Sequence, residues 1–143
     1  VVIFDGIVAN LPHPPVFFRR AHELLRPGGL LYVTTPHGRG LSCRFLGTAW
    51  SAWAPPEHLH LFSTKSMALA ALSAGFSRPI TYTRGLNPYE LLKAFRRSAT
   101  TPRGTEVNAA LMRTGSGRWL KRLANALLRS TSLGDQLYLE AIA

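Results

Sequence analysis

The chain has 143 residues, of which 46% are hydrophobic and 10% aromatic, which is enough for one domain with a buried core. Its single cysteine, Cys43, excludes a disulfide framework. The sequence also contains no run of 18 apolar residues, which a membrane-spanning helix would need. The net charge is +10, and ten of the 17 basic residues fall within 84–130, which favours anionic partners. The sequence begins without Met, inside an apolar run, and shows no signal peptide. We therefore expect a piece of a longer, cytoplasmic protein.

Strands and helices alternate along the first part of the chain. Residues 1–9 are apolar almost throughout, which predicts a strand buried on both faces of a parallel sheet. A loop rich in proline follows, and Pro27-Gly28-Gly29 ends a helix predicted over 15–26. The apolar residues of that helix recur at helical spacing: Phe17, Ala21, Leu24 and Leu25. Residues 30–35 form the next predicted strand.

The second part begins with a long segment, 36–62, that has no clear period and predicts a loop. Ser63 is a suitable N-cap for a helix over 64–74, which Gly75 ends. Further elements are predicted in chain order: a strand over 80–83, helices over 87–97, 106–113 and 117–129, and a final strand over 136–142. Alternating strands and helices indicate an α/β sheet, in which ligands bind beyond the carboxyl ends of the strands.

Two segments carry a resemblance to a known family. The sequence FDGIVAN at 4–10, followed by a helix and by LRPGGLLYVTTP at 25–36, resembles the second half of a class I S-adenosylmethionine-dependent methyltransferase. The stretch WAPPEHLHLFS at 53–63, with AGF at 74–76, resembles a broad bacterial subgroup of small-molecule methyltransferases. The similarity covers about residues 2–84 and, more loosely, the last strand.

This resemblance implies a partial Rossmann-like α/β methyltransferase sheet. The four predicted strands would be the fourth to seventh of a seven-stranded sheet, with the last inserted antiparallel. Residues 1–143 would form one partial methyltransferase domain, and 85–134 would be a basic helical insertion between the last two strands. The family's glycine-rich loop and the acidic residue that binds ribose are not in this sequence, so the cofactor-binding N-terminal half would be missing.

The family's cofactor is S-adenosylmethionine, which lies beyond the strand that residues 1–9 would form. By the resemblance, Ala9, Asn10 and His13 are the candidate cofactor-binding residues. Asn10 is equally well suited to a turn, because an asparagine shortly before a proline favours one. The segment between Asn10 and the following helix is about four residues shorter than the family pattern.

The stretch 53–62 holds the candidate catalytic and substrate-binding residues. Methyl transfer needs a nucleophile without its proton, and His58 or Glu57 is placed to accept that proton. Trp53, His60 and Phe62 are candidates to wall a substrate pocket. The alternative interpretation is that the histidines only brace the loop and the tryptophans belong to the core. No metal site is expected, because the spacing of the histidines and Cys43 matches no closed zinc pattern.

Two functions remain open at this point. The first is methyl transfer to a small-molecule acceptor, with an activity that this incomplete chain alone is not expected to show. The second is a non-catalytic remnant or binding module that acts through its basic helices on anionic lipid or nucleic acid. Residues 117–129 have apolar and cationic faces suited to peripheral membrane contact, whereas no nucleic-acid-binding module is recognisable. The sequence does not indicate an oligomeric state.

Overall fold

The computed structural model describes residues 1–86 and 131–143. The elements follow the order β1 (Val2–Asp5), a 3₁₀ turn (Val8–Asn10), α1 (Pro14–Leu24), β2 (Leu30–Pro36), α2 (Leu41–Leu46), a second 3₁₀ turn (Gly47–Ala49), α3 (Thr64–Ser73), β3 (Ser77–Arg84) and β4 (Gln136–Ile142). The helices predicted within 87–129, and nearly all of the predicted insertion over 85–134, lie outside the described residues.

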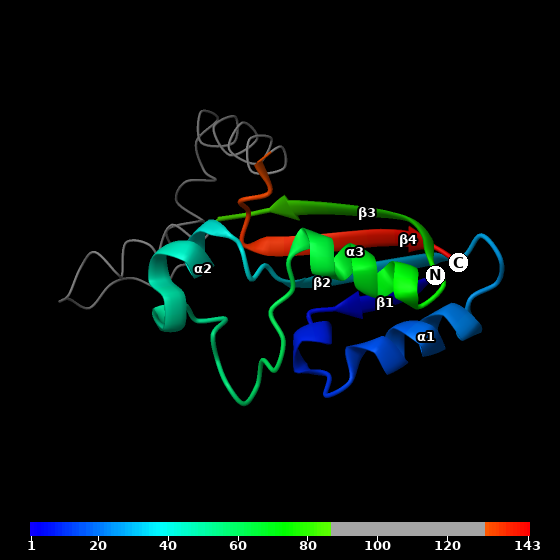
Figure 1. The fold of residues 1–143 in the computed structure, drawn as a ribbon, viewed down its shortest axis with the longest axis horizontal. Helices are drawn as coiled ribbons and strands as arrows, with labels where there is room; N and C mark the ends of the chain where they lie inside the picture. Colours follow the sequence, from blue (N-terminus) through cyan, green and yellow to red (C-terminus); the bar gives the residue numbers. More distant parts are fainter. Residues whose placement is uncertain (87–130) are drawn as a thin grey trace, which may run out of the picture.

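The four strands form one mixed sheet in the order β1-β2-β4-β3 (Figure 1). β1 and β2 are parallel and are connected through α1, as a parallel pair requires a crossover. β4 lies between β2 and β3 and runs antiparallel to both. The prediction of an α/β sheet whose last strand is inserted antiparallel is therefore confirmed.

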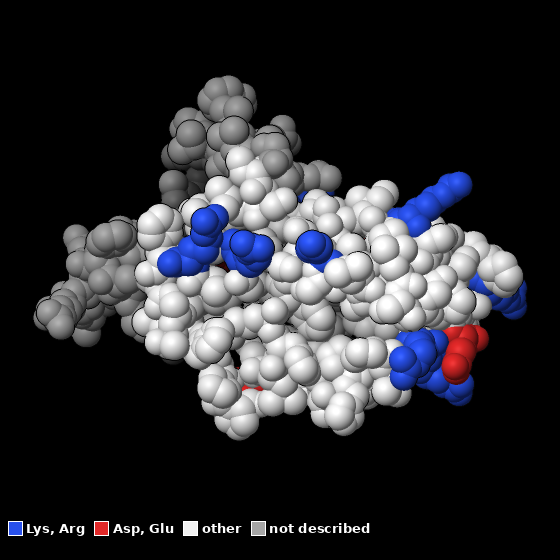
Figure 2. Space-filling model, viewed as in Figure 1, with Lys and Arg blue, Asp and Glu red and all other residues white. Residues whose placement is uncertain are grey.

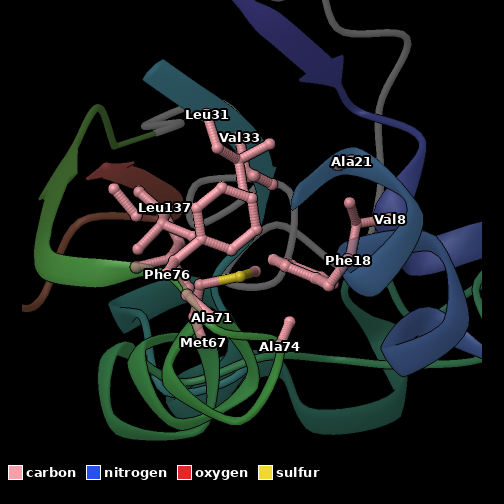
Figure 3. Packing of buried hydrophobic residues seen from close by; sticks show 12 residues of the cluster. Val8, Phe18, Ala21, Leu31, Val33, Met67, Ala71, Ala74, Phe76 and Leu137 are labelled. Carbon is pink, nitrogen blue, oxygen red and sulfur yellow. The ribbon is translucent and has the colours of Figure 1, made fainter. Parts of the chain in front are cut away.

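Helices α1 and α3 cover the same face of the sheet and enclose the core (Figure 1). Figure 3 shows side chains from α1, α3 and the strands meeting there. Along each strand only alternate residues reach this core, because successive side chains point to opposite faces. The fully buried large apolar residues are Val8, Phe18, Leu31, Val33, Met67, Leu137 and Leu139. This packed layer holds the carboxyl ends of β1 and β2 in place.

The first strand differs from its prediction in length and in burial. β1 ends at Asp5 rather than at residue 9, because Gly6 has a φ of +70° and turns the chain into the 3₁₀ turn. Ile3 is 61% exposed, so the prediction of a strand buried on both faces was wrong for the described part. α1 covers one face of β1, and no described element covers the other.

The first helix begins and ends earlier than expected and presents a different phenylalanine to the core. α1 spans Pro14–Leu24, and Phe18 and Ala21 are its buried aromatic and small apolar residues. Phe17, which the sequence placed on the apolar face, is 39% exposed. Phe18 instead packs edge-to-face against Phe4 of β1.

The predicted loop 36–62 contains a short helix, α2, which was missed. Its six residues lie between Gly40 and Gly47, and so few residues give no readable period. The prediction for α3 is confirmed in detail. The Ser63 side chain accepts a hydrogen bond from the Ser66 backbone, and the Ser66 side chain accepts one from the Ser63 backbone.

Candidate functional site

The candidate site lies at the carboxyl edge of the sheet, where β1 and β2 end side by side. The backbone N–H of Gly6 donates to the carbonyl oxygen and to the hydroxyl oxygen of Thr34, each at 3.0 Å. The Thr34 hydroxyl in turn donates to the Asp5 carboxylate. Asp5 therefore joins the two strand ends, which is a structural role.

The 3₁₀ turn after β1 is tied to the loop that carries the candidate catalytic residues. The backbone N–H groups of Leu59 and His60 both donate to the carbonyl oxygen of Ala9, at 2.8 and 3.0 Å. Ala9 itself is fully buried. Its carbonyl thus fixes the 59–60 segment beside the end of β1, and this contact positions His60.

A second attachment fixes the same loop beside the end of β2. His37 and Phe62 form a parallel bridge, and the backbone N–H of Gly38 donates to the Phe62 carbonyl at 2.8 Å. Phe62 also packs against the core, half-buried. Two strand ends and the 58–62 segment are therefore held together as one rigid edge.

A pocket of about 600 Å³ opens at this edge, in the size range of small-molecule sites. It brings together three of the predicted site residues, Trp53, His58 and His60. The remaining lining residues are Gly38, Ala52, Ala54, Pro55, Leu59 and Leu61. We call this the histidine pocket. Its mostly apolar lining with two imidazoles suits a small molecule.

His58 has a defined orientation in the histidine pocket. Its ring Nδ1 lies 2.7 Å from the carbonyl oxygen of Ala52. A carbonyl only accepts, so Nδ1 carries the proton and Nε2 of the neutral ring has a free lone pair. The His58 backbone N–H also donates to the Ala54 carbonyl at 3.0 Å, which holds the residue from a second side.

His60 is held differently from His58. Its ring lies 6.1 Å from the ring of Phe62, and its Nε2 is buried without a hydrogen-bond partner among the described residues. A buried polar atom without a partner costs free energy, which is a signal of a missing ligand or water. His60 thus lines the pocket, while its unsatisfied Nε2 is enclosed by the protein.

The other predicted site residues lie outside the histidine pocket. Glu57 is exposed on the loop between Trp53 and His58. Asn10 is exposed at the end of the 3₁₀ turn, and His13 is exposed as the N-cap of α1 without a side-chain cap bond. Their roles stay predictions.

Sequence reasoning missed a second, polar pocket of about 240 Å³ on the other side of Gly38. It is lined by His37, Arg39, Arg44, Thr64, Thr131, Ser132 and Leu133. His37 is 1% exposed, and its Nδ1 lies 2.9 Å from the Gly134 carbonyl. Burial lowers the pKa of His37, although the bond to Gly134 and the charge of Asp135 oppose this. The sequence signal that could have indicated this pocket is the position of residues 37–39 directly after a predicted strand.

The comparisons with known proteins agree with this fold. A methyltransferase domain family matches residues 1–78, more than half of the chain. This chain belongs to the methyltransferase domain family. Among functionally curated proteins, no sequence matches it significantly.

Solved methyltransferase structures share the fold of this family member. One is an S-adenosylmethionine-dependent methyltransferase from Thermotoga maritima, described as a possible histamine N-methyltransferase. It has a TM-score of 0.59 and 12% identity, and the alignment covers 98% of this chain and 53% of that one. Another, an S-adenosylmethionine-dependent methyltransferase from Archaeoglobus fulgidus, has a TM-score of 0.54 and 13% identity, over 99% and 58% of the two chains. The present chain spans little more than half the length of these enzymes.

The described part of this methyltransferase-family chain leaves the turn after β1 open to solvent. At Gly6 a Cβ would meet no atom within 4 Å, so open space adjoins the turn after β1. Gly38 and Gly40 do not form a cradle, since a Cβ there would lie 2.9 Å from Leu61 and 2.7 Å from Gly134. These two glycines serve close packing of the chain on itself. No helix in the described ranges is long and apolar enough to cross a membrane.

Proposed function

We propose that the protein transfers a methyl group from S-adenosylmethionine to a small-molecule acceptor that binds in the histidine pocket. The observation that carries this proposal is the orientation of His58. Its Nδ1 proton is engaged by the Ala52 carbonyl, so Nε2 is the basic atom, in a pocket beside the ends of β1 and β2. The family match and the shared fold support the reaction class.

When bound, the cofactor would supply a sulfonium methyl group, whose carbon a nitrogen, oxygen or carbon nucleophile attacks, with S-adenosylhomocysteine as the leaving thioether. The residues of this chain prepare the nucleophile. His58 Nε2 accepts the proton that the acceptor atom loses, and the resulting imidazolium is stabilised by its bond to Ala52. The turn at residues 6–10 flanks the cofactor, with Asn10 as its exposed polar side chain.

The walls of the histidine pocket orient the acceptor and displace water from it. Trp53, which is 47% exposed, offers an aromatic face to an apolar or cationic part of the acceptor. His60 contributes its imidazole ring to the wall of the pocket. Holding both reactants in contact is expected to supply a large part of the rate acceleration.

The substitution His58→Asn tests this proposal. Asn retains an N–H group for the Ala52 carbonyl but has no ring nitrogen to accept a proton. We expect kcat to fall by about 100-fold or more, as for the loss of a general base. The measurement is S-adenosylhomocysteine release by the protein with a panel of small amine and hydroxyl acceptors.

The matched control is Glu57→Gln, which removes the neighbouring carboxylate outside the pocket. We expect it to leave kcat unchanged. If Glu57→Gln abolishes turnover while His58→Asn does not, Glu57 is the base and our assignment is wrong. If the unsubstituted full-length protein transfers methyl to no acceptor of the panel and binds no cofactor, the proposed function itself fails.

A further inference from the structure

The smaller polar pocket lies beside the histidine pocket and has a different chemistry. It is formed where β2, α2, the start of α3 and the residues before β4 meet, and we call it the arginine pocket, after Arg39 and Arg44. Its volume of about 240 Å³ holds several water molecules at roughly 30 Å³ each. That space suits one charged group of a molecule rather than a whole acceptor.

Among the described residues that line the arginine pocket, two are basic and none is acidic. Within the described ranges, neither the Arg39 nor the Arg44 guanidinium group makes an ion pair or hydrogen bond. Figure 2 shows basic side chains gathered on the face above α2 and the start of α3, without acidic residues among them. Arg44 also stands in the last turn of α2, where a cation is favourable for the helix, but Arg39 has no such structural reason.

Hydroxyl groups complete the lining of the arginine pocket. The hydroxyls of Thr64 and Ser132 have no hydrogen-bond partner in the described part of the chain. Ser132 has a φ of +52°, a backbone conformation that is costly for a residue other than glycine. Such strain is concentrated at functional positions, where it aims a side chain. Guanidinium and hydroxyl donors together match an oxyanion.

Asp135, an acidic residue close to His37 in the described part of the chain, is engaged by α2. Asp135 accepts from the Ser42 backbone N–H at 2.8 Å and from the Ser42 hydroxyl at 2.6 Å. These bonds hold its carboxylate on α2, and Asp135 is not among the residues that line the pocket. His37 forms part of the wall and donates its Nδ1 proton to Gly134.

We propose that the arginine pocket binds a phosphate or carboxylate group of the methyl acceptor. Residues 37–39 separate the two pockets, since Gly38 lines the histidine pocket while His37 and Arg39 line the arginine pocket. An acceptor with an anionic end would therefore be held by Arg39 and Arg44 near the place where its other end meets His58. The assignment to the acceptor rests on the proposed function, whereas oxyanion binding does not.

Binding of an oxyanion is tested on the protein with inorganic phosphate, and with acetate in a parallel titration, at constant ionic strength. The imidazole NMR signals of His37 report from the pocket wall. We expect a saturable shift with at least one of the two anions, and an apparent Kd raised about tenfold or more by Arg39→Gln with Arg44→Gln. Arg19→Gln with Arg26→Gln, on the exposed surface of α1 and its following turn, is the matched control and should leave the Kd unchanged.

The absence of any saturable shift overturns the proposal, as does a shift that persists undiminished in the Arg39/Arg44 variant. The link to the acceptor is tested separately, with pairs of acceptors that differ only in an anionic group. The Arg39/Arg44 variant should raise KM for the anionic member alone. If phosphate binds but KM changes equally for both members, the pocket is an oxyanion site unrelated to the acceptor. If no acceptor is methylated but phosphate still binds, the proposed function fails while oxyanion binding stands.

Discussion

At the scale of single residues, Tyr82 has a strongly raised pKa. It belongs to a stacked aromatic cluster on the face of the sheet opposite α3. The rings of Tyr82 and Tyr138 are nearly parallel with centroids 5.1 Å apart, and the Arg84 guanidinium lies 5.0 Å from the Tyr82 ring. The Tyr82 hydroxyl donates to Glu140 at 2.9 Å. Burial, followed by this bond and the negative charge of Glu140, raises the pKa of Tyr82 to about 12.

This shift predicts a loss of stability in alkaline solution. Between the ordinary pKa of 10.0 and the folded pKa of about 12, the unfolded chain has lost the Tyr82 proton while the folded chain keeps it. The contribution of protonated Tyr82 to the free energy of unfolding is therefore fully present below pH 10 and is lost as the pH rises through about 12. Phenolate absorbance during a pH titration, with Tyr82→Phe to assign the signal, measures the pKa of Tyr82 in the folded protein.

The control for this prediction is Glu140→Gln, which removes the negative charge and should lower the pKa of Tyr82. The pKa of Tyr138 is also raised by burial, so the assignment by Tyr82→Phe is needed. If the phenol assigned to Tyr82 titrates at its ordinary value in the unsubstituted protein, the described packing of the cluster is wrong.

The candidate site illustrates what single residues reveal before a structure is known. The sequence pointed to His58 and His60 because both lie in one motif beside a strand end. It did not indicate which ring nitrogen of His58 carries the proton, because the Ala52 contact depends on how the loop bends back. His37 meets Gly134 across 97 residues of sequence, and no local pattern encodes a contact of that range.

At the scale of elements, α2 depends on a contact that is distant in sequence. A helix of six residues is not stable alone, since ordering its first turn costs more conformational free energy than its few hydrogen bonds provide. Asp135 supplies the missing stabilisation by accepting from the backbone and the hydroxyl of Ser42 in the first turn of α2. Gly40 is required beside this contact, because a Cβ there would lie 2.7 Å from the Gly134 carbonyl.

We expect Ser42→Ala to destabilise the protein by about 2 kcal/mol, since it removes a buried hydrogen bond to a carboxylate. The matched control is Ser77→Ala, whose hydroxyl makes an exposed 3.2 Å bond to the Ile142 carbonyl and should change stability by less than about 0.5 kcal/mol. Urea unfolding measures both. Equal effects of the two substitutions would contradict the anchoring of α2 by Asp135.

The contrast between α3 and α2 explains which elements the sequence predicted. α3 has its own start and stop, in the Ser63 cap and in Gly75 with a φ of +97°, so local rules were sufficient. α2 is specified by Asp135, which lies 93 residues after its partner Ser42. The sequence predicted the wrong phenylalanine, Phe17 instead of Phe18, on the core face for a similar reason. The edge-to-face contact of Phe18 with Phe4 is tertiary and has no local signal.

At the scale of the whole molecule, the sheet order was predictable only through the family resemblance. Alternating strands and helices indicated an α/β sheet, but no local signal placed β4 between β2 and β3. The resemblance implied that the last strand is inserted antiparallel, and the register of seven paired residues between β2 and β4 agrees with that. The same order directs the ends of β1 and β2, together with the loop 50–62, to one edge of the sheet.

The central claim is that this edge receives the cofactor and the acceptor, and amide chemical-shift mapping with S-adenosylhomocysteine tests it most directly. We predict that the shifts concentrate at residues 6–10 and at 58–60, which the Ala9 carbonyl joins. The turn at 27–29 lies at the opposite edge of the sheet, after α1 and before β2, and should stay unchanged. Shifts centred on 27–29, or the absence of shifts at 6–10 while the ligand binds, would contradict the account.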